Sequence, residues 1–138
     1  WVQREYRNLH LAREGGVRVP TPLAVRNNVL LMELIGDKEA SLQIKDDRPK
    51  DPKAFFKSIV DELKKLYKVG IVHGDLSQYN ILNYHEKPVL IDFSQGTTKK
   101  SPNAMELMKR DITNLCNFFR KLGIEKDVDE TVKEITRP

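Results

Sequence analysis

The sequence predicts an α+β fold in which helices make up most of the mass. Stretches near residues 1–14, 52–69 and 102–122 carry apolar side chains at helical spacing, whereas the apolar runs suited to strands are few and short. The chain has 138 residues, of which 39% are hydrophobic and 32% charged, so it can bury one core. We therefore expect one mainly helical domain with a few short strands.

The N-terminal elements are predicted to be a helix and a hairpin. Apolar side chains recur at helical spacing over residues 1–14, and a Gly-Gly pair at 15–16 ends the pattern. After an extended, proline-containing connector, residues 23–26 and 29–35 have the composition of strands. Because the Asn-Asn pair at 27–28 can turn the chain between them, these residues predict an antiparallel hairpin, which a polar loop follows.

A long amphipathic helix is predicted after that loop. Asp51 suits its N-cap, Pro52 its first position, and Gly70 a left-handed position just after its end. A second long amphipathic helix lies nearer the C-terminus, and Gly123 ends it. The remaining predictions are strands at residues 71–72, 81–82 and 88–91, a loop at 96–100, and helices at 102–122 and 129–135.

Charge and cysteine content limit the environment and the partners. Lysine and arginine exceed the acidic residues by 24 − 20 = 4 and are spread along the chain, so direct nucleic-acid binding is not indicated. The single cysteine, Cys116, cannot form an internal disulfide and suits a reducing compartment, so we expect a cytoplasmic protein. The longest apolar stretch, residues 29–35, contains Glu33 and is too short to cross a membrane.

The most informative segment is residues 72–92. Asp75 is followed five positions later by Asn80, and a short apolar run then ends at Asp92. Phosphoryl transfer from Mg-ATP uses an aspartate that accepts the proton of the attacking hydroxyl, together with hard oxygen ligands for the metal. We therefore expect Asp75 to be catalytic and Asn80 and Asp92 to bind Mg²⁺, with Mn²⁺ as an alternative.

The spacing of these residues also has a mechanical reason. Short apolar segments on both sides of the Asp75 loop can anchor its backbone, so that Asp75 and Asn80 point into one cleft. Taken singly, each residue also fits a structural role, with Asp75 and Asn80 in turns and Asp92 at a strand end. The complete ordered string favours the catalytic interpretation, because it matches the catalytic-loop and metal-loop pair of kinase-like enzymes.

With these residues in view, the chain resembles the RIO family of atypical serine/threonine protein kinases, and most of all its type-one, archaeal-like branch. The resemblance covers nearly all 138 residues. It rests on Trp1, Arg-Glu-Tyr-Arg-Asn-Leu at 4–9, Val-Pro-x-Pro at 19–22, Leu-Leu-Met-Glu-Leu-Ile-Gly at 30–36, the string at 73–82, Ile-Asp-x-Ser-Gln at 91–95 and Arg-Asp at 110–111. The Leu-Ser step inside the 73–82 string favours type one over type two.

The resemblance implies a protein-kinase-like fold, here mainly the helical C-terminal lobe with the hinge hairpin and the C helix of the small lobe. Residues 1–36 would be the remnant of the small lobe and hinge, and residues 37–138 the C-terminal lobe. The implied site roles are Asp75 as catalytic aspartate, Asn80 and Asp92 as metal ligands, Glu5 as partner of the ATP-anchoring lysine, Met32, Glu33 and Ile35 as the hinge that meets adenine, and Ser77 beside the phosphates.

The function implied by the resemblance is that of an ATP-dependent serine/threonine kinase or an ATPase. No long peptide-docking segment follows Asp92, so ATP hydrolysis or autophosphorylation is implied as readily as transfer to a bound peptide. The family is linked to maturation of the small ribosomal subunit. The expected partners are therefore ATP, Mg²⁺ and either a pre-ribosomal small subunit or a protein substrate.

Two other functions stay open. One is a different kinase-like phosphotransferase, which a substrate-binding insertion after Asp92 would favour, although none is visible. The other is a catalytically silent binding module, because the glycine-rich loop and strand lysine that kinases use are absent from the sequence. Since the chain begins at Trp1, we expect an N-terminally incomplete kinase domain that turns over negligibly alone.

Overall fold

Helices and short strands alternate along the chain. The computed structural model describes residues 2–138; Trp1, where the first predicted helix began, lies outside the described residues. In chain order the elements are α1 (Val2–Glu14), β1 (Pro22–Arg26), β2 (Val29–Met32), α2 (Pro52–Lys68), β3 (Ile71–Val72), β4 (Ile81–Tyr84), β5 (Lys87–Leu90), β6 (Thr97–Thr98), α3 (Ala104–Lys121) and α4 (Val128–Thr136). This combination confirms the predicted α+β class.

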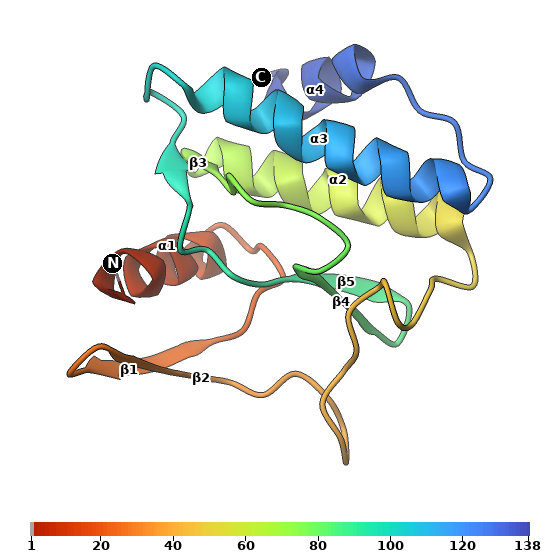
Figure 1. The fold of residues 1–138 in the computed structure, drawn as a ribbon. Helices are drawn as coiled ribbons and strands as arrows, with labels where there is room; N and C mark the ends of the chain where they lie inside the picture. Colours follow the sequence, from red (N-terminus) through yellow and green to blue (C-terminus); the bar gives the residue numbers. More distant parts are fainter. Residues whose placement is uncertain (1) are drawn as a thin grey trace.

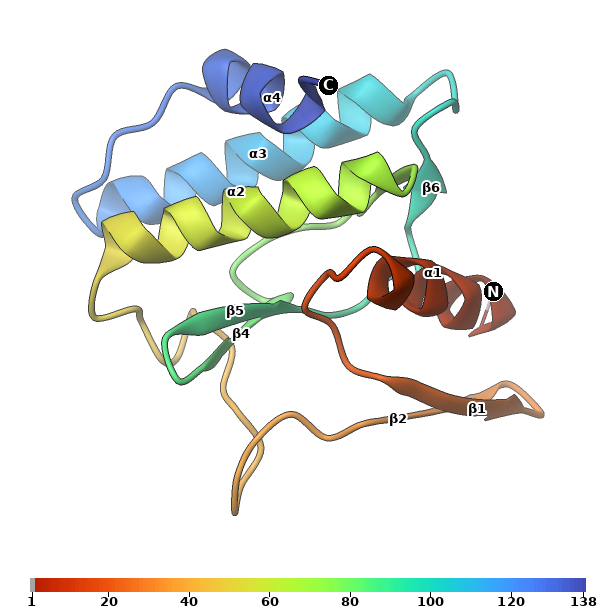
Figure 2. The same ribbon diagram turned by 180° about the vertical axis from the view of Figure 1, so that it is seen from behind.

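The elements form two groups with a hairpin between them. Figure 1 shows α2 and α3 side by side with α4 beyond them, while α1 and the β1–β2 hairpin lie at the opposite side of the molecule. Figure 2 shows the same arrangement from behind, with the β4–β5 hairpin between the two groups. Contacts of α4 with both α2 and α3, and of α1 with both β1 and β2, agree with these views.

The strands pair as three separate two-stranded antiparallel sheets. The β1–β2 hairpin was predicted, but β2 ends at Met32 rather than at residue 35. Pro22 opposite Met32 has no N–H, so the ladder stops there apart from one hydrogen bond from the Glu33 N–H to the Thr21 carbonyl at 2.8 Å. The second difference is β6, which pairs with β3 although its residues were predicted as loop.

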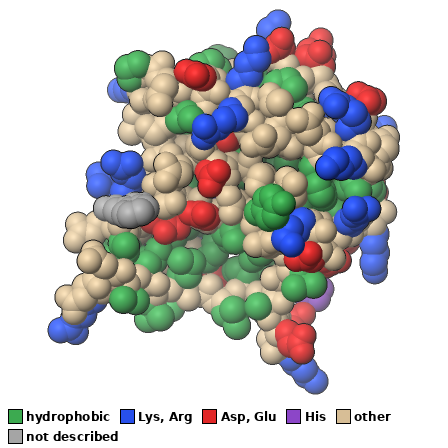
Figure 3. Space-filling model, viewed as in Figure 1, with side chains coloured by type: hydrophobic (Ala, Val, Ile, Leu, Met, Phe, Trp, Pro, Cys, Tyr) green, Lys and Arg blue, Asp and Glu red, His purple; other side chains and the backbone are tan. Residues whose placement is uncertain are grey.

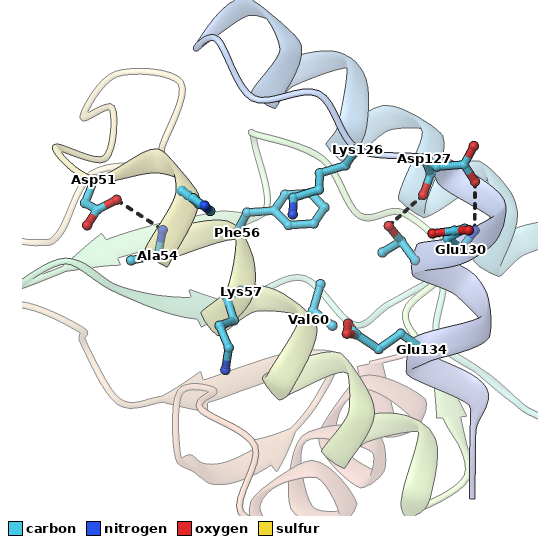
Figure 4. A pocket seen from close by; sticks show the side chains of 11 residues that line it. Asp51, Ala54, Phe56, Lys57, Val60, Lys126, Asp127, Glu130 and Glu134 are labelled. Carbon is cyan, nitrogen blue, oxygen red and sulfur yellow. Dashed lines mark hydrogen bonds between the residues drawn. The ribbon is translucent and has the colours of Figure 1, made fainter.

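Two aspartates begin two of the helices, as Figure 4 shows. The Asp51 carboxylate accepts a hydrogen bond from the Ala54 N–H at 3.2 Å, which confirms the predicted cap of α2. The Asp127 carboxylate accepts one from the Glu130 N–H at 2.9 Å, so α4 begins one residue before the predicted start. Both caps satisfy N–H groups that have no partner within the helix.

The core lies between α2, α3 and the β4–β5 hairpin. Phe55 and Phe56 of α2 pack against Phe119 of α3, and the Phe56 and Phe119 rings meet edge to face with centroids 5.2 Å apart. Cys116 is buried beside them, as its position in an apolar helix stripe predicted. Within residues 2–138, no helix combines the length and the apolar character needed to cross a bilayer.

The β1–β2 hairpin differs from this core because it leaves apolar side chains in contact with solvent. Figure 3 shows hydrophobic side chains gathered over the lower part of the molecule, where the hairpin lies in Figure 1. Leu23 and Leu31 are each 57% exposed, and Leu34, just after the hairpin, is 73% exposed.

Candidate functional site

The loop between β3 and β4, residues 73–80, carries Asp75 and is shaped by a buried histidine. His73 is 1% exposed, and its Nδ1 accepts a hydrogen bond from the Asp75 N–H at 3.1 Å. Its Nε2 lies 2.8 Å from the carbonyl of Ile91. Because one nitrogen must accept and the other must donate, a neutral ring with its proton on Nε2 satisfies both contacts. His73 thereby links the backbone of Asp75 to the strand end that carries Asp92.

Asp111 of α3 fixes the same loop from the helical side. Its two carboxylate oxygens accept hydrogen bonds from the Gly74 N–H at 2.9 Å and the Leu76 N–H at 3.0 Å, and the Arg110 guanidinium donates to the Gly74 carbonyl. Burial raises the pKa of the Asp111 carboxyl, whereas the two N–H donors and Arg110 favour its charged form. Asp111 therefore holds the backbone on both sides of Asp75.

The position of Asp111 in the helix pattern is a local signal that its side chain is buried and bonded. The residue lies three positions after Met108 and four before Leu115, so it sits on the inward, apolar stripe of α3. A carboxylate on a stripe of this kind must find hydrogen-bond donors when it is buried.

Gly74 allows the Asp75 loop to approach the segment after Asp92. Its φ is +86°, and a Cβ placed there would lie 2.5 Å from the carbonyl oxygen of Gln95. A side chain at this position would therefore be strained by its backbone conformation and would also force the two loops apart.

Asn80 joins the two predicted catalytic segments. Its side-chain N–H donates to the carbonyl of Asp75 at 2.6 Å, and its own carbonyl accepts from the Ile91 N–H at 3.0 Å. The side-chain nitrogen of Asn80 is thus engaged, which leaves its side-chain oxygen for another partner. Asn80 consequently connects the Asp75 loop with the Ile91–Asp92 strand end.

Asp92 is exposed and has an uncommon backbone conformation. Its φ is +60°, in the left-handed region that Asp tolerates better than most residues. One carboxylate oxygen, Oδ1, accepts hydrogen bonds from the Ser94 hydroxyl at 2.8 Å and the Ser94 N–H at 3.4 Å. The left-handed conformation and the Ser94 contacts set the direction of the carboxylate.

Helix α1 is tied to residues 92–96, the predicted metal loop, by two side chains. The Phe93 N–H donates to Glu5 Oε2 at 3.0 Å, and the buried Asn8 side chain donates to the carbonyls of Phe93 and Gly96, each at 3.4 Å. Partial burial raises the pKa of Glu5; the Phe93 N–H opposes this rise, and the nearby Asp92 carboxylate adds to it. Glu5 and Asp92 are therefore neighbours, and Asn8 is a contact that the sequence did not predict.

Five of the predicted site residues line one cleft of about 520 Å³. Helix α1, the end of the β1–β2 hairpin and the strand end at Asp92 contribute residues to the cleft. Its predicted members are Glu5, Met32, Glu33, Ile35 and Asp92, and it is also lined by Pro20, Leu34, Ala40, Ser41, Leu82 and Ile91. Most of its other lining side chains are apolar, which is typical of small-molecule sites.

Some backbone N–H and C=O groups of residues 33–35, just after β2, are engaged in hydrogen bonds and others are not. The Glu33 N–H donates to Thr21, and the Ile35 carbonyl accepts from the Ser41 N–H at 2.8 Å. Among the hydrogen bonds of residues 2–138, the Glu33 carbonyl and the Ile35 N–H take no part. The Glu33 carboxylate accepts from the Thr21 N–H and hydroxyl, each at 3.0 Å, and these bonds lower its pKa.

Asp75 and Ser77 line a second hollow, which shares no lining residue with the first. This hollow, of about 420 Å³, is polar and is also lined by Asn114, Asn117 and Lys121 of α3. The Ser77 hydroxyl accepts from the Tyr79 N–H at 3.2 Å. The structure thus places Asp75 and Ser77 together in this hollow, and neither of them lines the cleft that holds Asp92.

The donor set suits magnesium better than a softer metal. Within residues 2–138, no group of three or more His, Cys, Asp or Glu side chains is placed to hold a metal ion. Magnesium is commonly held by one or two carboxylates together with substrate phosphates and waters. Asp92 would supply one carboxylate and Asn80, whose backbone carbonyl accepts from the Ile91 N–H, one amide oxygen, a donor set that fits that mode of binding.

Comparisons with known proteins agree with this geometry. The RIO domain family matches residues 1–132. The chain is 41% identical over 138 residues to the RIO-type serine/threonine-protein kinase Rio1 of Methanocaldococcus jannaschii, and 39% identical over 137 residues to that of Haloferax volcanii. Each alignment covers 99% of this chain and 47% of the relative, so the chain spans about half the length of these proteins.

Solved structures show the same fold. The crystal structure of the Rio2 kinase from Chaetomium thermophilum, determined as a complex with ADP, Mg²⁺ and phosphoaspartate, superposes with a TM-score of 0.81 at 23% identity. The superposition covers 99% of this chain and 44% of that one. The kinase-like fold predicted from the sequence is therefore confirmed, and the chain belongs to the RIO family of serine/threonine protein kinases, with Rio1 proteins of archaea among its relatives.

Proposed function

We propose that this chain carries the Mg-ATP site of a RIO-type serine/threonine kinase or ATPase. The observation that carries the proposal is the cleft in which Glu5, the hinge segment and Asp92 meet, next to the loop of Asp75 and Asn80. We assign residues 1–36 to the small lobe and hinge and residues 37–138 to the C-terminal lobe. This division is supported by the cleft, because both ranges contribute lining residues to it.

The adenine ring would lie at the hinge. The free Glu33 carbonyl and the free Ile35 N–H are an acceptor and a donor two positions apart, which matches the donor and acceptor on the edge of adenine. Met32, Leu82 and Ile91, which line the same cleft, would give apolar surface for the ring.

The phosphates would extend from the hinge toward Asn80 and Asp92. The side-chain oxygen of Asn80 and the carboxylate of Asp92 would hold Mg²⁺, which when bound neutralises charge on the phosphate oxygens. Glu5 would orient the small-lobe groups that hold the phosphates, and its bond to the Phe93 N–H keeps α1 against the metal loop.

Asp75 would orient the attacking hydroxyl and accept its proton. The carboxylate is exposed in the polar hollow, while its backbone is held by His73, Asn80 and Asp111 on either side. A fixed backbone with a free carboxylate suits a group that must meet an acceptor from solvent. Ser77, in the same hollow, would act on the acceptor side or beside the terminal phosphate.

ATP hydrolysis is the second candidate activity. The solved Rio2 complex contains a phosphoaspartate, so an aspartate carboxylate of that protein takes the phosphoryl group. In this chain an aspartate carboxylate of the site would attack the γ-phosphorus, ADP would leave, and water would then release phosphate and restore the carboxylate. Rapid quenching followed by hydroxylamine, which cleaves acyl phosphates, distinguishes this route from transfer to a serine hydroxyl.

A role in maturation of the small ribosomal subunit is supported by family membership alone. The phosphoryl acceptor would in that case be a protein of the precursor particle or the chain itself.

Calorimetric titration of a non-hydrolysable ATP analogue, with and without Mg²⁺, tests the site. We expect Mg²⁺ to strengthen binding of the analogue to the full-length protein. The variant Asp92→Asn keeps the shape of the side chain but removes its charge. It should weaken Mg²⁺-dependent binding by at least about tenfold. Asp75→Asn should preserve nucleotide binding and lower turnover by roughly 10²–10⁴-fold. Asp46→Asn, in an exposed loop, is the matched control.

Equal binding heat with and without Mg²⁺ would instead favour a catalytically silent module. Transfer to a small molecule but not to protein would favour a different kinase-like phosphotransferase.

A further inference from the structure

A second part of the surface gathers positive charge around one hollow. The hollow, of about 680 Å³, lies where the C-terminal ends of α2 and α4 meet the turn after β6, and none of its lining residues belongs to the ATP cleft. We call it the basic hollow. Its cations are Lys64, Lys65, Lys68, Lys99 and Arg137, and among the residues that the structure describes no Asp or Glu lines it. The sequence did not show this group, because three separate segments of the chain contribute to it.

Most of these cations have no acidic partner. Among the ion pairs of residues 2–138, only Lys65 of the five takes part, with Glu62 at 3.0 Å. The hollow between α2 and α4 shown in Figure 4 is different, because Lys57 and Lys126 share it with carboxylates such as Asp127 and Glu134. The basic hollow therefore has a single sign of charge, whereas the neighbouring hollow is mixed.

The basic hollow is also partly preorganised. The Lys99 ammonium lies 4.8 Å from the centre of the Tyr67 ring, and the Lys99 N–H donates to the Gly70 carbonyl at 2.9 Å. Tyr67, Ile135 and Pro138 give the hollow an aromatic and apolar floor between the charges.

Helix electrostatics explain only part of this arrangement. Lysines in the last turn of a helix interact favourably with its dipole, which accounts for Lys65 and Lys68 on α2. The same effect does not account for Lys99, which lies in a turn after a strand, beside the same hollow.

We propose that the basic hollow binds the phosphate backbone of a single-stranded nucleic acid. Unpaired cations from several segments around a concave surface match a flexible polyanion, and the floor offers apolar contact to a base or sugar. An acidic protein segment would use the cations but has no need of that floor, so the nucleic acid fits the surface better. The proposal is independent of the ATP site.

Fluorescence anisotropy of a short labelled oligouridylate, titrated with the 138-residue chain, tests the proposal. If the four unpaired cations each contact one phosphate, affinity should fall roughly fifty-fold between about 50 mM and about 200 mM salt. The double variant Lys68→Ala with Arg137→Ala should bind more weakly, and its affinity should fall only about seven-fold over the same range. Lys57→Ala with Lys126→Ala removes equal charge from the mixed hollow and should bind like the wild type.

A second variant, Lys64→Glu, should also weaken binding, and Asp92→Asn should not, since it changes only the ATP cleft. The proposal is wrong if the oligouridylate does not bind at low salt, or if the control pair weakens binding as much as the pair in the basic hollow. Displacement of the oligouridylate by polyglutamate at equal charge concentration would also overturn it, by assigning the surface to acidic proteins.

Discussion

The side chains of His73 and Asp111 hold the loop that carries Asp75, although neither is proposed to touch a substrate. Asp111 binds the N–H groups on both sides of Asp75, and His73 binds that of Asp75 itself. A buried N–H left without an acceptor costs about 1–3 kcal/mol, so each of these contacts has a large effect on the loop conformation. Asp75 can therefore be exposed to solvent and still keep a fixed position.

Glu5 leads to a prediction about pH. Its pKa is raised in the folded state, so the unfolded chain loses this proton at lower pH than the folded chain. Between the two pKa values the folded state binds more protons, and stability falls as pH rises through that window. Glu5→Gln keeps an acceptor for the Phe93 N–H but does not titrate.

We therefore expect Glu5→Gln to gain stability relative to the wild type as pH rises from about 4.5 through the raised pKa, and the difference to become constant above it. Urea unfolding of both proteins across this pH range measures the difference. A constant difference throughout would show that the pKa of Glu5 is not raised.

The helix α4 shows how a short element depends on its end and its packing. It has nine residues, fewer than an isolated helix needs to be stable in water. Its buried side chains, Thr131 and Ile135, pack on the core, and Asp127 caps its first turn. Packing and cap together compensate for the short length.

Asp127→Ala should lower the free energy of unfolding by about 0.5–2 kcal/mol, because the Glu130 N–H loses its acceptor. Asp129→Ala is the matched control, since it also removes a first-turn carboxylate but no cap, and should cost less, about 0.3–1 kcal/mol. Denaturant unfolding with a common m-value measures both. Equal losses in the two variants would show that the charge matters and the cap does not.

Taken together, the chain places its proposed nucleotide cleft between two unequal groups of elements. The helical group has a packed core, whereas the β1–β2 hairpin leaves Leu23, Leu31 and Leu34 exposed. Neither β1 nor β2 contains a lysine, and residues 2–138, which the structure describes, include no glycine-rich loop between two strands. The groups that kinases use to hold the β- and γ-phosphates are therefore not among those that line the cleft.

For this reason we expect the 138-residue chain alone to bind Mg-ATP weakly and to turn it over at a negligible rate. Release of radiolabelled phosphate and incorporation of label into the chain measure both activities, with the longest product of the gene as the comparison. Robust autophosphorylation by the 138-residue chain would contradict this expectation.

Much of the secondary structure could be predicted, because its signals are local. The cap at Asp51, the Asn-Asn turn at 27–28 and the apolar stripes of α2 and α3 depend on residues a few positions apart. The pairing of β3 with β6 could not be predicted. The two threonines of β6 alone are a weak indication of a strand, and they form one only by pairing with residues distant in the sequence. The predicted end of β2 lies beyond its observed end at Met32. The reason is that Pro22, which lacks an N–H, lies opposite Met32 on the partner strand.

The spacing of Asp75, Asn80 and Asp92 likewise identified the candidate site residues from the sequence. This was possible because only a few residue types can accept a proton or bind a metal. The roles of these residues stay predictions. The environment of these residues became visible only in the folded chain. There, Asn8 and Asp111 are hydrogen-bonded to backbone groups that are distant in the sequence. Ser77 lies outside the cleft, and five cations surround one hollow. The physical reason is that periodicity and turn chemistry act over a few residues, whereas these contacts join segments that become neighbours only when the core packs.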